Sequence, residues 1–444
     1  MKFFKFFLII PLCLNAELVI EITKGSDNPY RIALIPFQGE SNIAKEANDI
    51  VKNDLLRTGE FYIFDEKSLI AYPPSEDFIN YSDWRLINAD YLLLTSVTES
   101  SSGIEARYEI FDVRKKSKIR SSKVYGVSNN VRQLSHYVSD GIYEAITGIK
   151  GVASTKILYV NQSNNLDLSY KLLVADADGA NEQLLVKSPE PIISPAWSPD
   201  SKKVAYVSFE TGTANVYIQD ISTGDRESII KKTCPSCSTN EQISSPSWSP
   251  DGKYLSLTLY QDGNAEIYIY NLQKRNLTRL TNHYSIDTES KWSPDGRKLM
   301  FTSGRSGSPQ LYELDLRKLN KKPKRLTFEG NYNAKGSYLP GGEGIVFVHR
   351  SSDQFQIAIR YFEDNFVIPL TDAKMDESPS VSPNGNVIIY AISELDTDIL
   401  AGVTLSGAKF RLPSAKGQVR EPAWSGFLKS VSYTHLTLPT TTSV

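Results

Sequence analysis

The sequence predicts an α/β N-terminal domain followed by an all-β six-bladed β-propeller, which is closed by strands from both ends of the propeller region. Three observations support this prediction. Two helical patterns alternate with β-branched strands in the first third of the chain. After Gly151, strands become short and turns frequent, and a Trp-Ser-Pro-Asp-Gly motif recurs every 43 to 51 residues, the length of a four-stranded blade. The last motif copy lacks the strands that should follow it.

Residues 1–16 have the pattern of a cleaved export signal. Two lysines, Lys2 and Lys5, precede an apolar run that ends at Leu14-Asn15-Ala16, and the mature chain would begin at Glu17. Cys13 leaves lipid attachment open as an alternative, which the bulky residue before it disfavours. No later segment contains the roughly 20 apolar residues of a transmembrane helix, so we expect an exported chain without a direct membrane span.

Residues 17–150 are predicted to form the α/β domain. One helix should begin at Ser41 or Asn42 as the cap, continue through Leu55 and end before Gly59. A second should run from about Asn130 to Thr147 and stop at Gly148. The strands expected around these helices are Leu18–Ile22, Ile32–Ile35, Tyr91–Val97, Ala106–Val113 and Lys123–Val127.

Residues 152–428 are predicted to form the propeller. The motif copies begin at Trp197, Trp248, Trp292, Tyr338, Val381 and Trp424. In each, we expect the aromatic residue to face the adjoining blade, the Asp to hold a backbone N–H and the Gly to adopt a positive φ. Six motifs predict six blades.

The two ends of this region should share one blade. The copy at Trp424 is truncated, whereas strands at Ile157–Val160, Tyr170–Ala175 and Gln183–Val186 have no motif before them. Joining them completes a blade and removes the open sheet edges. Residues 429–444 are rich in threonine and are expected to be a disordered tail, whose origin in the native protein stays open.

Composition excludes some partners and cofactors. The formal net charge of −2 and the pI near 6.2 do not suit nucleic-acid binding. Cys234 and Cys237 are expected to form a local disulfide or to be free thiols, since a zinc site would need two further ligands. No cofactor is expected, although acidic loops leave room for a calcium ion in the propeller channel. The chain is expected to be a monomer.

An exported α/β domain followed by these repeats resembles the TolB family. The resemblance extends from the signal to about Leu428, and its most specific segments lie at 35–38, at 136–143 with Thr147-Gly148, and at 418–425. It implies a periplasmic adaptor of the Tol-Pal system that supports outer-membrane integrity and envelope constriction during cell division. The implied partners are the OmpA-like domain of the lipoprotein Pal and the inner-membrane protein TolA.

The resemblance also implies two binding sites. Pal should bind at the mouth of the channel, where the loops that enter each motif strand are expected to line one face. The residues expected to contact it are Thr288 and Glu289, together with Asp287, Ser245, Asn333, Glu377 and Glu421. TolA should bind the mature N-terminus, which comprises Glu17, Leu18, Val19, Ile20, Glu21 and Ile22. This alternating strand suits addition to a partner's sheet edge, although it could also pack into its own domain.

An exported propeller enzyme, either a hydrolase or a polysaccharide lyase, is the alternative. A hydrolase needs a Gly-x-Ser-x-Gly elbow, and the nearest string, Gly304 to Gly307, should be a hairpin turn around Ser306. A lyase needs clustered histidines, whereas His136, His283, His349 and His435 are scattered along the sequence. We therefore expect no enzyme activity.

Overall fold

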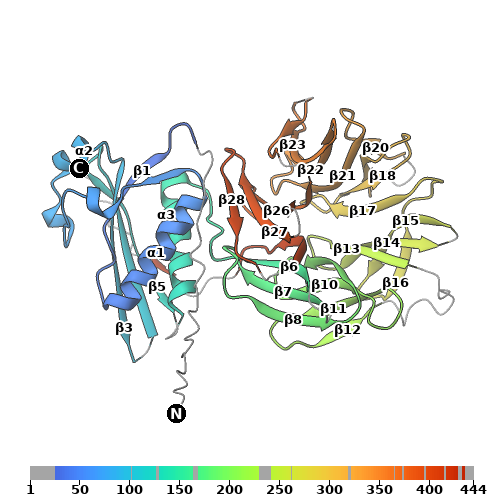
Figure 1. The fold of residues 1–444 in the computed structure, drawn as a ribbon, viewed down its shortest axis with the longest axis horizontal. Helices are drawn as coiled ribbons and strands as arrows, with labels where there is room; N and C mark the ends of the chain where they lie inside the picture. The colour runs from blue at the N-terminus through green and yellow to red at the C-terminus, as the bar shows by residue number, and fades with distance from the viewer. Residues whose placement is uncertain are drawn as a thin grey trace, which may run out of the picture.

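The computed structural model describes residues 26–101, 103–126, 130–163, 169–229, 242–261, 263–318, 322–364, 366–372, 375–394, 397–414, 417–428 and 433–435. Residues 1–16, the Glu17–Ile22 segment and Cys234 with Cys237 lie outside these ranges. Within them the chain folds into a first domain with two long helices and a propeller, which stand side by side (Figure 1).

The first domain is built on one mixed sheet with the strand order β2-β1-β3-β4-β5-β30. Its strands are β1 (Tyr30–Leu34), β2 (Phe61–Ile63), β3 (Tyr91–Ser100), β4 (Gly103–Asp112), β5 (Ser117–Gly126) and β30 (Tyr433–His435). β1 pairs in parallel with β2 and β3, and the other pairs are antiparallel. Four of the predicted strands, namely those now seen as β1, β3, β4 and β5, are therefore confirmed with ends shifted by a few residues, and β2 was not predicted.

The helices are α1 (Ser41–Arg57), α2 (Tyr81–Leu86) and α3 (Val131–Thr147), with short 3-10 turns at Glu66–Ser68 and Glu76–Phe78. α1 and α3 cover one face of the sheet, where Val51 and Val138 pack in the same core as Ile110. Alternate strand residues such as Phe111 pack with Trp84 of α2 in a second core. α1 and α3 thus stand between the sheet and the propeller (Figure 1).

The helix ends differ from expectation at one point. Asn130 caps α3 by accepting a hydrogen bond from the Gln133 N–H, and Gly148 ends it in the left-handed conformation at φ 77°. α1 instead begins at Ser41 itself, after Glu40, whose side chain makes no capping hydrogen bond. The predicted caps at Ser41 and Asn42 are therefore wrong, because both residues already lie within the first helical turn.

The propeller consists, in the described chain, of six four-stranded sheets. The first three, listed from the inside outward, are β9 (Ile192–Trp197), β10 (Lys203–Ser208), β11 (Asn215–Asp220) and β12 (Arg226–Ser228); β13 (Gln242–Trp248), β14 (Tyr254–Gln261), β15 (Asn264–Asn271) and β16 (Asn276–Arg279); and β17 (Asp287–Trp292), β18 (Lys298–Ser303), β19 (Gln310–Asp315) and β20 (Lys324–Arg325).

The next three are β21 (Tyr332–Tyr338), β22 (Gly344–Ser351), β23 (Gln354–Tyr361) and β24 (Ile368–Pro369); β25 (Asp376–Val381), β26 (Val387–Glu394), β27 (Thr397–Thr404) and β28 (Lys409–Leu412); and β29 (Gln418–Trp424), β6 (Lys156–Gln162), β7 (Tyr170–Asp176) and β8 (Gln183–Ser188). The last sheet combines a strand from the C-terminal end with three strands that follow the first domain. β29 pairs antiparallel with β6, from Gln418 opposite Gln162 to Trp424 opposite Ile157.

The innermost strands surround a central channel. Each of β9, β13, β17, β21 and β25 contacts the next inner strand in this order, and β29 contacts both β25 and β9. Between the sheets, aliphatic and aromatic side chains form continuous cores, as Ile157 and Tyr159 do with Leu400 of the neighbouring sheet.

The motif turns act as the sequence predicts. In the second copy, the Ser249 hydroxyl donates to Asp251 at 2.7 Å and lowers the pKa of that carboxyl, which accepts the Lys253 N–H at 3.1 Å. Gly252 follows with φ 70°. The aromatic residue reaches the preceding blade, as the indole of Trp292 donates to the Ser247 carbonyl at 3.1 Å. In these copies the motif therefore closes a turn at Asp251 and joins two blades at Trp292.

The first domain packs against the side of the propeller where the motif turns lie. Asn384, which replaces the motif aspartate, donates to the Lys150 carbonyl at 2.9 Å, and Asn386 donates to the Tyr143 hydroxyl at 3.0 Å. An aspartate at 384 could not donate this bond. Because each inner strand runs from its entry loop to its motif turn, the entry loops lie at the opposite end of the channel.

Two further observations concern membranes and the chain's end. No helix of the described chain is both long and apolar enough to span a bilayer. Tyr433–His435 form β30 at the edge of β5, where the sequence predicts a disordered tail. That expectation fails for these three residues, because the free edge of β5 offers unpaired backbone groups with which an extended segment can pair.

Trp424 tests the importance of the shared blade. Its side chain is buried and its indole donates to the Thr155 hydroxyl at 2.7 Å, so it joins the two ends of the propeller region. We expect Trp424→Ala to lower the free energy of unfolding by about 3–5 kcal/mol, measured by urea denaturation. Tyr284→Ala, which truncates an aromatic side chain that is 86% exposed, should change it by less than about 0.5 kcal/mol. Similar losses in the two variants would contradict the role of Trp424.

Candidate functional site

A ring of left-handed residues surrounds the central channel. One residue of each inner strand has a φ between 51° and 57°, a conformation that is rare for residues other than glycine. These residues are Ser194, Ser245, Glu289, Lys335, Ser378 and Glu421. All of them line one cavity, together with Pro195, Pro246, Ser290, Lys291, Pro379 and Pro422. We call these six left-handed residues the channel ring.

The ring has one cause in every blade. The register between the inner strand and its neighbour shifts at this point, as between Thr288 and Lys291, so the strand bulges and turns one residue toward the channel. In each blade the ring residue stands three positions before the first residue of the motif, as Glu289 does before Trp292. Because a left-handed residue costs about 1–2 kcal/mol, six such residues are a strained feature of the kind found at functional sites.

Charged ring residues bridge neighbouring blades. Glu289 accepts the Lys335 N–H at 3.2 Å and the Thr302 hydroxyl at 2.9 Å, and Glu421 accepts the Ser194 N–H. The Lys335 ammonium donates to the Ser378 hydroxyl at 2.8 Å. Lys291 is exposed to solvent in the channel, but many protein atoms lie close to it. Their desolvating effect lowers the pKa of Lys291, although the negative charges of Glu289 and Glu421 act to raise it. The channel therefore presents both signs of charge.

The structure separates the predicted Pal-contacting residues into two groups. Ser245, Glu289 and Glu421 are ring residues, the Thr288 side chain is half-buried beside them, and the Glu377 side chain is 52% exposed. Asp287 and Asn333 are fully buried. The expectation that these two line the exposed face is therefore wrong.

Strand alternation explains the burial of Asp287 and Asn333. Each stands two positions before a ring residue, where Ile243 and Val419 occupy the core of other blades. Asp287 pairs with Arg305 at 2.5 Å, and Asn333 donates to Gln310 at 2.9 Å and contacts His349 at 2.8 Å. The polar groups of Asp287 and Asn333 therefore make ion-pair and hydrogen-bond contacts inside their own blades.

Sequence reasoning missed Lys335 and Ser378 of the ring. The constant spacing before the motif would have identified both. It also missed exposed apolar side chains on three loops that enter inner strands: Tyr284, Ile286, Phe328 and Met375, which are 48% to 86% exposed. Together with the ring, they form an apolar and charged surface at the end of the channel away from the first domain.

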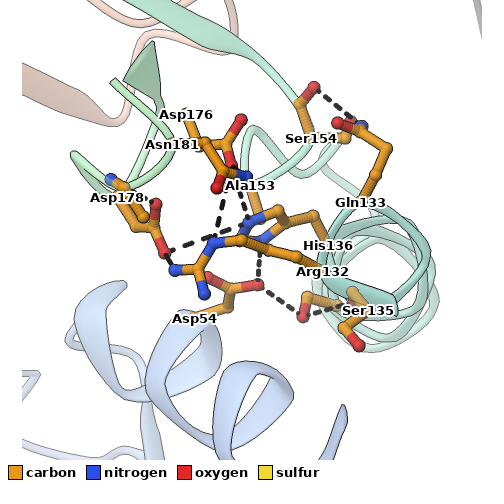
Figure 2. Close-up of polar contacts among 12 residues, drawn as sticks. Asp54, Arg132, Gln133, Ser135, His136, Ala153, Ser154, Asp176, Asp178 and Asn181 are labelled. Carbon is orange, nitrogen blue, oxygen red and sulfur yellow. Dashed lines mark hydrogen bonds and ion pairs between the residues drawn. The ribbon is translucent and has the colours of Figure 1, made fainter. Parts of the chain in front are cut away.

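A second polar site lies between the domains and is shown in Figure 2. Asp54 of α1 accepts hydrogen bonds from Arg57 at 2.8 Å and Ser139 at 2.8 Å, and it contacts the His136 Nδ1 of α3 at 2.7 Å. On the propeller side, Asp178 pairs with Arg132. All these contacts lie at the boundary between α1, α3 and the turn after β7.

Further along α3, the same helix face continues to bind the propeller. Asp140 accepts the Ala153 N–H at 2.7 Å and the Ser154 N–H at 3.0 Å, and burial raises its pKa to about 6 against these hydrogen bonds. Tyr143 donates to Glu60 of the first domain at 2.8 Å and accepts a hydrogen bond from Asn386 of the propeller at 3.0 Å. α3 therefore packs on the sheet with one face and on the propeller with the other.

The interdomain site also contains the group of side chains in the described chain that could ligate a metal, namely Asp54, His136 and Asp178. Arg57, Arg132 and Lys156 already form ion pairs with its carboxylates or with the adjacent Asp176. Three fixed cations balance the three carboxylates, so a divalent cation would add excess positive charge. The donor set does not favour a metal.

The residues considered for catalysis do not converge. His136 lies in the domain interface, His349 lies inside a blade, and His283 accepts the Ser285 N–H in an entry loop. His435 lies in β30, and Ser306 lies in a hairpin turn in which the Gly307 N–H donates to the Gly304 carbonyl at 3.0 Å.

The ring conformation can be tested at Ser245, which has φ 54°. Ser245→Val should lower the free energy of unfolding by about 1–2 kcal/mol, because a β-branched side chain is strained in the left-handed region. Ser245→Gly should change it by less than about 1 kcal/mol, because glycine adopts this conformation freely. Both are measured by urea denaturation, and equal losses in the two variants would show that lost side-chain contacts dominate.

Family models match both parts of the chain. The TolB amino-terminal domain model matches residues 18–119, and the TolB beta propeller domain model matches residues 143–428. Among solved structures, the chain is similar to the crystal structure of TolB from Acinetobacter baumannii, with 39% identity and a TM-score of 0.83 over 93% of this chain and 100% of that chain. Fold and sequence therefore agree.

Curated relatives match over almost their whole length. The Tol-Pal system protein TolB of Alcanivorax borkumensis is 41% identical over 417 residues, which are 93% of this chain and 94% of the relative. The protein of the same name from Pseudomonas aeruginosa is 37% identical over 414 residues, which are 92% and 94% of the two chains. From the match in both domains, we conclude that this chain belongs to the TolB family.

Proposed function

We propose that the chain is a non-catalytic periplasmic component of the Tol-Pal system, which binds the OmpA-like domain of Pal at the channel ring and TolA through its mature N-terminus. The relatives described above are named as Tol-Pal system proteins. The observation that carries the Pal site is the channel ring, in which six strained residues present their side chains toward one opening.

The chemistry of this surface supports a protein partner. The entry loops carry exposed apolar side chains such as Tyr284 and Phe328, and the cavity lined by the channel ring contains charged groups of both signs. Protein interfaces commonly combine apolar anchors with polar groups in this way. Of the residues expected to contact Pal, the proposal keeps Thr288, Glu289, Ser245, Glu377 and Glu421. Asp287 and Asn333 would act from the blade interior by holding the strands that carry the ring.

The two binding sites would lie at different ends of the protein. The first domain packs on the motif-turn side of the propeller, and the ring opens away from it. A partner at the ring would therefore leave the first domain accessible to a second partner. The Glu17–Ile22 segment lies outside the described residues, so TolA binding rests on its alternating sequence and on the family.

The proposal includes neither catalysis nor a cofactor. Among the described residues of the channel, no histidine or serine considered for catalysis lies beside a second group that could act with it as acid or base. The carboxylates of Glu289 and Glu421 accept hydrogen bonds from backbone N–H groups. A calcium ion in the channel would meet the ammonium groups of Lys291 and Lys335. The positive charges of these two ammonium groups in the same cavity oppose the binding of a cation.

The Pal site can be tested with substitutions that keep shape. Thr288→Val with Glu289→Gln removes a hydroxyl and a charge, and we expect about tenfold or weaker binding of a purified Pal OmpA-like domain, measured by isothermal titration calorimetry. The melting temperature should fall by no more than a few degrees, because both replacements are nearly isosteric.

Glu363→Gln is the matched control for this double variant. Glu363 is exposed on a turn between β23 and β24, on the motif-turn side, and carries the same chemical change. It should leave Pal affinity unchanged. If the double variant also binds Pal with unchanged affinity, Thr288 and Glu289 do not belong to the interface.

The TolA site can be tested by deletion. Removing Glu17 to Ile22 should abolish binding of purified TolA and leave Pal affinity unchanged, because the deleted strand would add its backbone to a sheet edge of TolA. Surface plasmon resonance with both partners measures this. Loss of both interactions would indicate that the segment supports the fold instead.

A further inference from the structure

His136 joins the two domains through carboxylates on both sides. Its Nδ1 lies 2.7 Å from Asp54 in the first domain, and its Nε2 lies 3.9 Å from Asp176 and 3.9 Å from Asp178 in the propeller (Figure 2). The side chains of all four residues are between 1% and 6% exposed. Nε2 has no hydrogen-bond partner, so its environment is set by these two carboxylate oxygens.

The protonation state of His136 decides whether this arrangement is attractive. A neutral imidazole that donates from Nδ1 to Asp54 presents a lone pair on Nε2 to two carboxylates, which repel it. An imidazolium presents an N–H to the same oxygens and is attracted by them. Burial alone disfavours the imidazolium, but Asp54, Asp178 and Asp176 outweigh it and raise the pKa of His136 above its ordinary value.

Other charged groups complete the environment of His136. They are Arg57 beside Asp54 on α1, Arg132 and Asp140 on α3, and Lys156 of β6 beside Asp176. Arg132 and His136 both draw Asp178 toward the first domain, and together with Arg57 they lower the pKa of that carboxyl in spite of its burial. Asp54, Asp176, Asp178 and ionised Asp140 are four carboxylates against three fixed cations, so one positive charge on His136 balances the site.

We propose that His136 is a proton-operated lock between the two domains: as an imidazolium it bridges Asp54 of the first domain to Asp176 and Asp178 of the propeller, and loss of its proton loosens the docking of the domains. The lock lies at the motif-turn side of the propeller, beside the blade that β29 and β6 share. If the domains loosen at this boundary, the orientation of the first domain relative to the channel ring changes, whereas the ring itself keeps its structure.

The direction of the pH effect follows from the arrangement. His136 keeps its contact with Asp54 in both states, so it is Asp176 and Asp178 that make its pKa higher in the docked state than in the undocked one. The resulting contribution to docking is complete below the pKa of the undocked state and is lost as pH rises through the docked value. Each unit by which docking raises the pKa changes the ratio of docked to undocked chains by about tenfold. Asp140, whose pKa is raised to about 6, is almost fully ionised only above about pH 7, so the effect of His136 is measured from about pH 7 upward.

Two measurements on the full mature chain test the lock. NMR of the imidazole nitrogens should give His136 a pKa above the ordinary histidine value, and small-angle X-ray scattering should show the radius of gyration increasing as His136 loses its proton. In His136→Gln, which can still donate to Asp54 but does not titrate, the radius of gyration should not change with pH. His283→Gln makes the same chemical change in an entry loop and should retain the wild-type pH profile.

Asp178→Asn provides a variant that keeps the histidine, in case His136→Gln does not fold. Removing this carboxylate should lower the pKa of His136 and shift the scattering transition to lower pH by the same amount. The proposal is overturned if His136 titrates at or below the ordinary histidine value, if the wild-type radius of gyration is constant over this range, or if His136→Gln retains the transition.

Discussion

The pairing of β29 with β6 holds the rest of this structure in place. It joins segments that are far apart in sequence, as the hydrogen bond between Trp424 and Thr155, 269 residues apart, illustrates. Without this pairing the sheet of β6, β7 and β8 would lack its inner strand, and the cores on both of its faces would open to water. Because such a contact is highly non-local, it closes a large loop, and the entropy cost of that closure must be offset by the contacts within and between the blades.

The same pairing positions the two sites relative to each other. β6 follows α3 after a short connection, so the first domain rests on the blade that closes the propeller and on the neighbouring blade of β25 to β28. The motif turn of that neighbouring blade meets α3 through Asn386 and the connection after α3 through Asn384, and the entry loops are left at the far end of the channel. A protein with these two ends can hold one partner at each without steric competition.

Both sites rely on features that reduce stability locally. The channel ring holds six side chains in a strained conformation that brings Glu289, Lys335 and Glu421 to the channel. The interdomain site buries His136 among three carboxylates, of which Asp176 and Asp178 lie beside it only while the domains stay together. A rigid ring and a titratable boundary suit a protein in which binding at one end is communicated to the other, and such coupling requires two arrangements that differ in free energy.

The sequence by itself determined the class of fold, the number of blades and the two long helices, because these follow from periodicity. Turn residues recur once per blade length, and apolar residues recur with the helical period of about 3.6 residues on α1 and α3. The sequence also identifies the channel ring, including Lys335 and Ser378, because each ring residue stands three positions before the first residue of its motif. Only the tertiary structure decided that Asp287 and Asn333 are buried, since a bulge sets which side of the strand each side chain takes. It alone brought His136 to Asp176 and Asp178, because contacts between domains depend on how two finished surfaces dock and leave no periodic signal in the chain.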